Sequence, residues 1–389
     1  MNNETNLPGQ RQHLLSQGPG VGKAMCDYIE NEGVNVSRGG YGAAYSVEER
    51  VLDTRERLCA LFGFDKPENV VFTSGVTASL NAVLKGFLRP GDHVLCSSME
   101  HNAVMRPLVQ LEKQGVAFTR VPCSPAGELD PAELERLIRP ETKLVVMTHA
   151  SNVCGTLMPV QAVGDICRRH GLFFVLDAAQ TAGAVPIHME DMHIDALCFT
   201  GHKGLLGPQG TGGFLIRDEL AAQTAALTSG GTGSLSHTEE VPDFLPDKYE
   251  PGTPNLPGIL GLRAALQFLE GQGVAAIGEH ELDMAMRLIE GLRDIPRVRL
   301  AGRTARSDRT AVVSVVFEGM DNAGAAWLLE SEYGILTRCG LHCAPSAHQT
   351  LGTFPGGTVR FVPGRTTTAE EIDQALAAIR DIAGRSGED

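Results

Sequence analysis

Two buried strands, each followed by chemically active side chains, constrain the fold of this 389-residue chain more than any other feature. Leu172–Leu176 is a short apolar run that stops at Asp177, and Ile194–Phe199 is a second run that Lys203 closely follows. Unbroken apolar runs bounded by polar and glycine residues are typical of strands covered on both faces in a parallel sheet. Ligands of such sheets bind at the carboxyl ends of the strands. We therefore expect an α/β fold with a ligand site at Asp177 and Lys203.

A carboxylate at one strand end and a lysine at the next is the pair that pyridoxal phosphate (PLP) requires. The lysine forms a Schiff base with the cofactor, and the carboxylate keeps the pyridine nitrogen protonated so that the ring acts as an electron sink. The alternative is that Lys203 is a solvated loop charge and Asp177 a turn or cap residue, which is commoner for either residue alone. Glycines on both sides of His202 and Lys203 let other groups approach the backbone, and this favours the cofactor site.

A second pattern predicts a phosphate site. The strand expected over 69–73 leads through Ser74 and Gly75 into a helix, because apolar residues recur at helical spacing from Val76 to Leu88. The free N–H groups and the positive dipole end at such a helix start bind anions. Thr77 adds a hydroxyl. The alternative, compatible with the first, is an ordinary N-cap by Thr73 or Ser74.

Three further residues are candidates from their positions alone. His101 follows a strand over 93–97, where it either stacks on a planar cofactor or is a satisfied loop histidine. Asn152 follows a strand over 143–148, where it is placed to donate to the cofactor's phenolic oxygen. Arg38, in a glycine-rich stretch, is either a ligand contact or a loop charge.

The order of elements predicts two domains. Strands and helices alternate through Phe199, which indicates a mainly parallel sheet, expected to be seven-stranded, with helices on both faces. A loop-rich segment over 230–255 and two helices lead into an α+β module. We expect a large PLP-binding domain over 21–258 and a smaller C-terminal α+β domain over 259–389, with residues 1–20 joined to it.

Composition excludes several classes of function. The formal net charge of −14 leaves no basic stripe for nucleic acid or an anionic membrane. The first residues lack the apolar segment of a secretory signal, and no apolar run approaches membrane-spanning length. Nine cysteines without regular spacing indicate reduced thiols in the cytoplasm. No metal site is expected, because the Cys339–Cys343 segment lacks further ligands.

Short motifs spread along the chain resemble the class V, fold-type I PLP enzymes, specifically the cysteine desulfurase and selenocysteine lyase group. The combination of GHK after a hydroxyl residue with R-x-G-x-H-C-A is highly specific, and the segment around Cys343 is similar to the SUF-type branch. The motifs are SGVTAS (74–79), MEHNA (99–103), SNVCGT (151–156), DAAQ (177–180), TGHKGLLGPQGTG (200–212), EPGTPN (250–255) and RCGLHCAP (338–345).

The resemblance implies a role for each matching cofactor residue. Lys203 matches the Schiff-base lysine, Asp177 the partner of the ring nitrogen, and His101 the histidine stacked on the ring. Asn152 and Gln180 match groups at the phenolic oxygen. The residues implied at the phosphate are Gly75, Val76, Thr77, Thr200, His202 and Thr253. Of these, Thr253 matches a residue that reaches the neighbouring subunit's cofactor, which implies a homodimer with shared sites.

The resemblance also implies the substrate side. Arg360 matches the arginine that binds the substrate α-carboxylate, Arg338 matches the arginine of the cysteine loop, and Asn152 lies beside them. Cys343 matches the sulfur-accepting nucleophile. Only a thiolate is competent for this attack, so we expect its pKa to be lowered by the positive charge of Arg338 or His342. The alternative is that Cys343 is a buried, unreactive thiol. Cys339 is either structural or a second thiol that resolves a persulfide.

The implied function is a PLP-dependent cysteine desulfurase of sulfur metabolism and iron–sulfur cluster assembly. It converts L-cysteine to L-alanine, leaves a persulfide on Cys343 and passes the sulfur to an acceptor protein. One alternative is a selenocysteine lyase acting on L-selenocysteine, or another class V lyase or transaminase. Another is a non-catalytic scaffold or regulatory protein. Two departures from the family bear on that choice: Met1–Gly20 lacks the usual Asp-Asn-Ala-Ala-Thr stretch, and Gly364–Thr367 replaces a Tyr-Asn-Thr sequence.

Overall fold

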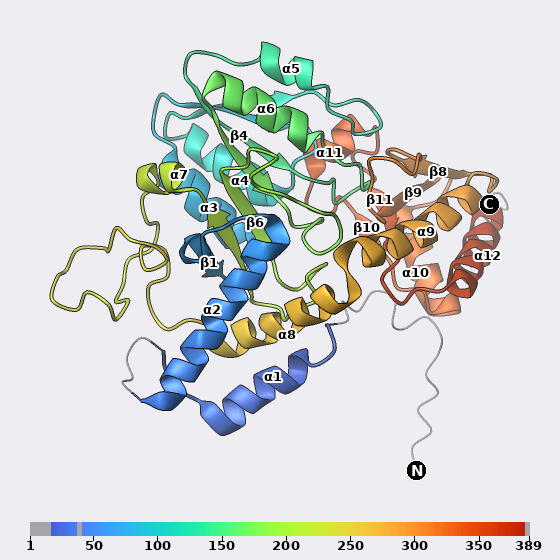
Figure 1. The fold of residues 1–389 in the computed structure, drawn as a ribbon. Helices are drawn as coiled ribbons and strands as arrows, with labels where there is room; N and C mark the ends of the chain where they lie inside the picture. Colours follow the sequence, from blue (N-terminus) through green and yellow to red (C-terminus); the bar gives the residue numbers. More distant parts are fainter. Residues whose placement is uncertain (1–16, 37–40, 386–389) are drawn as a thin grey trace.

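The computed structural model describes residues 17–36 and 41–385 (Figure 1). Arg38 and most of the expected N-terminal segment lie outside these residues. The larger of two sheets has the strand order β1-β7-β6-β5-β4-β2-β3. Its strands are β1 Val70–Thr73, β2 His93–Ser97, β3 Ala117–Val121, β4 Thr142–Thr148, β5 Phe173–Asp177, β6 Ala196–Thr200 and β7 Gly212–Ile216.

The pairing confirms the expected seven-stranded, mainly parallel sheet. Strands β6, β5, β4, β2 and β3 pair in parallel, whereas β7 is antiparallel to both β1 and β6. The sequence did not indicate β7, because a strand that opens on two glycines has little of the usual β signal. Strands β5 and β6 are adjacent, so Asp177 and the Lys203 loop emerge at the same edge of the sheet.

Helices cover both faces of this sheet, and each face has its own apolar core. One core contains residues of α3, α4 and α7, and the other contains residues of α2, α5, α6, α8 and α11. The helices are α1 Val21–Asp27, α2 Gly42–Phe62, α3 Val76–Phe87, α4 Asn102–Glu112, α5 Pro131–Arg136, α6 Val160–His170, α7 Asp218–Gln223, α8 Leu256–Gln272 and α11 Pro345–Thr350. Short π and 3-10 turns lie at Tyr28–Glu32 and Pro67–Asn69, so the helix expected over 21–31 is two elements.

A second, antiparallel sheet has the order β10-β11-β9-β8. A third apolar core lies between this sheet and helices α9, α10 and α12. Helix α8 packs against α1 and α2, and the chain then turns into α9, which packs against α12 (Figure 1). The elements are β8 Val298–Ala301, β9 Val313–Phe317, β10 Arg338–Gly340, β11 Thr358–Phe361, α9 Val274–Leu292, α10 Asn322–Tyr333 and α12 Ala369–Arg385.

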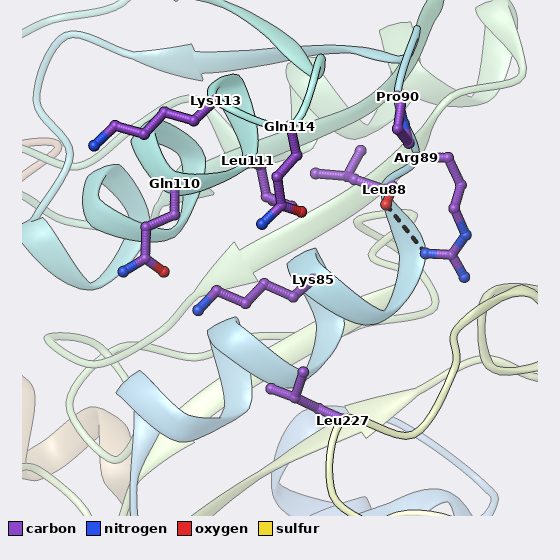
Figure 2. Close-up of a pocket in the computed structure, with 9 residues that line it drawn as sticks. All are labelled: Lys85, Leu88, Arg89, Pro90, Gln110, Leu111, Lys113, Gln114 and Leu227. Atoms are coloured by element: carbon purple, nitrogen blue, oxygen red, sulfur yellow. Dashed lines mark hydrogen bonds between the residues drawn. The ribbon is translucent and has the colours of Figure 1, made fainter.

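A surface cavity of about 570 Å³ lies between the carboxyl ends of α3 and α4 (Figure 2). Its cationic side chains are Lys85, Arg89 and Lys113. Lys85 is in the last turn of α3 and Lys113 is the C-cap of α4, where cations complement the helix dipole. The cavity is therefore remote from Lys203, since α3 and α4 begin at the strand ends that carry the site. Among residues 17–36 and 41–385, no helix has the length and apolarity needed to cross a membrane.

Candidate active site

Lys203 lies in a tight loop directly after β6. Gly201 N–H donates to the Thr211 carbonyl at 2.9 Å, and Leu206 N–H donates to the Lys203 carbonyl at 2.8 Å, so the loop backbone is fixed on both sides of the lysine. Burial lowers the pKa of Lys203, the charges of Arg360 and Arg338 lower it further, and Asp177 opposes them. This lowering shifts Lys203 toward the neutral amine relative to an exposed lysine, and the neutral amine is the form that attacks a carbonyl.

Asp177 ends β5 and is only 2% exposed. Its Oδ1 accepts a hydrogen bond from Ala179 N–H at 2.9 Å. Burial raises the pKa of Asp177, while that hydrogen bond and the charge of Lys203 act in the opposite direction. A buried carboxylate with a raised pKa is a stronger base than an exposed one, which suits a partner for a protonated ring nitrogen.

His101 is the N-cap of α4, and its Nδ1 accepts from Ala103 N–H at 3.0 Å. Burial lowers the pKa of His101 to about 4, and the positive charges of Lys203, Arg338, Arg106 and Arg360 lower it further. The ring is therefore neutral and carries its proton on Nε2. A neutral, fixed imidazole beside Lys203 is placed to lie against a planar ligand.

The start of α3, where an anion site is expected, has no side-chain cap. Its N-cap is Gly75, with φ of 147°, and no side chain caps the helix, so the expected N-cap by Thr73 or Ser74 is wrong. The φ of Gly75 is one that residues with a side chain rarely adopt, so the turn requires glycine. A Cβ built at Gly75 would lie 3.5 Å from Thr200 Oγ1, which is in turn 2.9 Å from His202 Nδ1. The start of α3 therefore lies beside the hydroxyl of Thr200 at the end of β6 and the imidazole of His202 in the loop that follows.

Cys343 is exposed on the loop between β10 and α11. His342 and Cys343 both have left-handed backbone conformations, with φ of 47° and 59°. Two hydrogen bonds from the large sheet's loops hold this tip: Asn102 N–H donates to the Cys343 carbonyl, and Asn152 Nδ2 donates to the His342 carbonyl, both at 2.8 Å. The backbone of the cysteine loop is therefore held against the start of α4, at the edge where Lys203 lies.

Two arginines come to this edge from the small sheet. Arg338 of β10 and Arg360 of β11 are cross-strand partners. Arg360 Nη1 donates to the Asn152 carbonyl at 2.7 Å, whereas its buried Nε has no hydrogen-bond partner among the described residues. Burial lowers the pKa of Arg360 to about 10, and Arg338 adds to this effect. An arginine donor that is buried and unused fits a carboxylate ligand, because the planar fork binds two oxygens at once.

His342 is not the source of positive charge at the cysteine loop. Its Nε2 is 3.0 Å from Thr358 Oγ1, and burial lowers the pKa of His342 to about 3. The imidazole is neutral near pH 7, so that expectation for His342 is wrong. The positive charges near Cys343 come from Arg338 and Arg360.

The structure adds one carboxyl that the sequence reasoning did not single out. Glu100 is completely buried, and it accepts from Ser97 Oγ at 2.5 Å and from Thr148 N–H at 3.0 Å. Burial raises the pKa of Glu100 to about 8, and the negative charge of Asp177 contributes. Glu100 joins the ends of β2 and β4 and fixes the backbone directly before His101. The available sequence signal was an acidic residue directly before the candidate His101.

Other expected residues lie at the margin of this group. Gln180 and Val76 are half-buried, and Thr77 and Thr253 are exposed. Cys339 is exposed, and its cross-strand partner Val359 points into the small core, so strand alternation places Cys339 on the face opposite Arg338.

Arg365, in the segment that departs from the family, stacks on Phe268. Its guanidinium carbon lies 5.3 Å from the centroid of that ring. Phe268 belongs to α8. The segment 364–367, which differs from the family sequence, therefore packs against the helix that leads from the large sheet toward the small one.

The family model described as Aminotransferase class-V matches residues 17–375. This chain belongs to the aminotransferase class-V family. The family is PLP-dependent. The chain is 30% identical over 368 residues to a probable cysteine desulfurase of Methanothermobacter thermautotrophicus, which covers 94% of this chain and 91% of that protein.

Solved structures of class-V proteins have the same fold. The apo cysteine desulfurase from Thermococcus onnurineus NA1 is similar with a TM-score of 0.88 and 29% identity, covering 97% of this chain and 94% of that chain. The cysteine desulfurase CsdA from Escherichia coli, in an S-sulfonic acid form, has a TM-score of 0.85 and 26% identity, with coverage of 95% and 92%. Membership of this family directs tests of activity to the residues at the strand ends described above.

Proposed function

We propose that this class-V protein is a cysteine desulfurase that binds PLP at Lys203 and transfers sulfur from L-cysteine to Cys343. One observation carries the proposal: Asn102 and Asn152 hold the backbone of the loop with the exposed Cys343 thiol at the same edge that bears the half-buried Lys203 and the buried Asp177. A transaminase would need the lysine and the carboxylate but has no use for the thiol.

The described residues fit PLP. The uncapped start of α3 with Thr200 and His202 suits the phosphate, and buried Asp177 suits the ring nitrogen. When bound, PLP supplies an electron sink for the negative charge that develops at the substrate Cα. Lys203, which attaches the cofactor, is also the base placed to move the Cα proton, because its lowered pKa shifts it toward the neutral amine.

Arg360 orients the substrate by binding its α-carboxylate. The unused Nε gives this arginine a free donor without breaking the hydrogen bond to the Asn152 carbonyl. Cys343 Sγ, as thiolate, then attacks the substrate sulfur. A sulfur–sulfur bond forms at Cys343, the substrate's carbon–sulfur bond breaks, and the carbon skeleton is protonated and leaves as L-alanine. Cysteine and one thiol thus become alanine and one persulfide, with no further oxidant or reductant.

We also propose that the protein is a homodimer and that Thr253 reaches the neighbouring subunit's phosphate. Four large apolar side chains near the start of the described chain support a partner surface: Ile29, Tyr41, Tyr45 and Leu52 are each 48% to 62% exposed. Exposed apolar residues gathered on neighbouring helical segments mark interaction surfaces. A soluble sulfur-acceptor protein is the expected second partner, because a persulfide on an exposed loop is open to another thiol.

The test is alanine release from L-cysteine, with a reducing thiol present, by PLP-loaded wild type and by Cys343→Ala. We expect alanine from the wild type and a loss of at least about a hundredfold in the variant, since covalent catalysis is removed. The variant should keep the wild-type PLP absorbance. Full turnover by Cys343→Ala would contradict desulfuration through this thiol and favour a transaminase. Alanine from L-selenocysteine alone would favour a selenocysteine lyase, and alanine from neither substrate a non-catalytic protein.

A further inference from the structure

A buried ion pair joins α2 to the segment that carries Thr253. Arg55 donates from Nη1 to Glu250 Oε1 at 3.0 Å and from Nη2 to Oε2 at 2.8 Å. The side chain of Arg55 is 9% exposed and that of Glu250 is 14% exposed. A two-pronged arginine–carboxylate pair in this degree of burial is strongly oriented, because both planar groups are fixed by two hydrogen bonds.

The same pair occupies the open edge of the large sheet. Strand β1 is at the end of the strand order, so one of its sides has no strand partner. Phe72 N–H donates to Glu250 Oε1 at 2.6 Å, and Arg55 Nη1 donates to the Val70 carbonyl. The Arg55 guanidinium also lies 4.5 Å from the centroid of the Phe72 ring. Glu250 is therefore fixed against the strand that leads directly to Gly75.

Residues 250–255 are held at both ends, and between them Gly252 N–H donates to the Gly231 carbonyl at 2.8 Å. Glu250 anchors one end. At the other end Asn255 Nδ2 donates to the Gly210 carbonyl at 3.2 Å, while its Oδ1 accepts from Gly258 N–H at 3.1 Å. Between them Thr253 is exposed and has no hydrogen bond to another described residue. A short segment clamped at both ends presents its central side chain outward in one defined position.

We propose that the Arg55–Glu250 ion pair positions Thr253 to bind the PLP phosphate of the neighbouring subunit. This inference rests on the proposed PLP-binding homodimer. Arg55 and Glu250 touch no cofactor, so they are positioning residues. Glu250 also accepts a hydrogen bond from β1, the strand that leads to Gly75. Within each protomer, the segment with Thr253 is therefore connected to that protomer's own phosphate site.

The competing explanation is that the pair only caps the sheet edge and stabilises the fold. Glu250→Gln separates the two explanations, because the amide oxygen can still accept from Phe72 N–H while the ion pair with Arg55 is lost. Asp53→Asn is the matched control. It removes an ion pair between the same helix α2 and Arg263 of α8, without contact to residues 250–255.

The first measurement is the PLP dissociation constant, followed by absorbance, with pyridoxal as the probe that lacks the phosphate. We expect Glu250→Gln to weaken PLP about tenfold, as for one lost charge-assisted hydrogen bond, and to leave pyridoxal unchanged. Thr253→Ala should give the same pattern. The double variant should be no weaker than Thr253→Ala alone, because the two substitutions remove one interaction. Asp53→Asn should titrate as wild type.

The second measurement assigns the effect to a subunit. Mixed dimers carry Lys203→Ala in one protomer, so that only the other protomer forms the lysine-bound absorbance band. Glu250→Gln placed in the Lys203→Ala protomer should weaken PLP at the remaining site. The same substitution placed in the protomer with intact Lys203 should leave that site unchanged.

Each failure has its own signature. Equal loss of PLP and pyridoxal affinity, wild-type titration of Glu250→Gln, or an effect confined to the substituted protomer's own site would overturn the positioning role. A wild-type protein that is monomeric or does not bind PLP would instead overturn the proposed function. If circular dichroism shows that Glu250→Gln is unfolded, Arg55→Lys replaces it as the test variant. It keeps the positive charge but loses the planar two-donor geometry, so it should weaken PLP binding in the same direction to a smaller extent. Unchanged PLP binding in that variant would also refute the inference.

Discussion

The two halves of the candidate site are built in opposite ways. Asp177 ends β5 and Lys203 lies in the hydrogen-bonded loop after the adjacent parallel strand β6, at the edge of a sheet that has an apolar core on each face. Cys343 stands on an exposed loop of the small sheet's side, in a left-handed conformation that two hydrogen bonds hold. Burial shifts the pKa values of Lys203 and Asp177 in the first half. In the second half, the hydrogen bonds of the loop backbone and the exposure of Cys343 determine where the thiol lies and what can reach it. Under the proposed function, the first half would set the chemistry of the cofactor and the second half would accept the sulfur.

The largest effect that would test this separation is expected from Asp177→Asn. The amide keeps the shape and the acceptor for Ala179 N–H but cannot hold the ring nitrogen protonated, so kcat should fall by on the order of a thousandfold. Circular dichroism should show a folded protein. The rate at which a thiol reagent modifies Cys343 should not change. Normal turnover would refute the assignment of Asp177, and a changed thiol reactivity would show that the two halves are not independent.

A smaller effect is expected from Arg360→Ala, which lies where the halves meet. We expect the KM for cysteine to rise roughly tenfold to a hundredfold, because charge-assisted hydrogen bonds to the carboxylate are lost, while the PLP spectrum stays unchanged. Steady-state kinetics with a parallel PLP titration measures both. Arg360→Lys, with the charge but without the fork, should fall between wild type and Arg360→Ala. An unchanged KM would remove Arg360 from the substrate site.

A third test concerns stability and not turnover: the pH dependence of unfolding that Glu100 causes. Its folded-state pKa of about 8 lies above the ordinary value of 4.5, so the stabilisation that its protonated form provides is fully present below about pH 4.5 and is lost as the pH rises toward 8. We expect wild type to lose up to about 1.4 kcal/mol per pH unit relative to Glu100→Gln across this window. Urea unfolding at pH 5, 6, 7 and 8 measures the difference; parallel curves would contradict a protonated Glu100.

The sequence predicted the buried half of the site better than the exposed half. Apolar runs that end at Asp177 and just before Lys203 are local signals, and parallel-sheet geometry brings their ends together without further information. The helix start after β1 followed similarly from a strand and a small-residue turn, and its binding of a phosphate stays a prediction. The N-cap expectation was wrong because Gly75, which lacks a side chain, takes the capping position.

The remaining features depend on pairing between distant segments. Residues 337–345 look like a loop, yet Arg338–Gly340 forms β10 because it pairs with β11. The ion pair between Arg55 and Glu250 joins residues far apart in the chain, and neither residue is part of a local pattern. His342 was one of two residues, with Arg338, expected to supply positive charge near Cys343, but its burial lowers its pKa to about 3.

The left-handed backbone at His342 and Cys343 has a consequence for the two hydrogen bonds that hold it. Non-glycine residues in this conformation are about 1–2 kcal/mol less stable per residue than in the right-handed one. The hydrogen bonds from Asn102 and Asn152 to the carbonyls of these two residues therefore offset a local conformational cost. The backbone position of Cys343 thus depends on contacts from the other sheet's side and not on the preferences of its own loop.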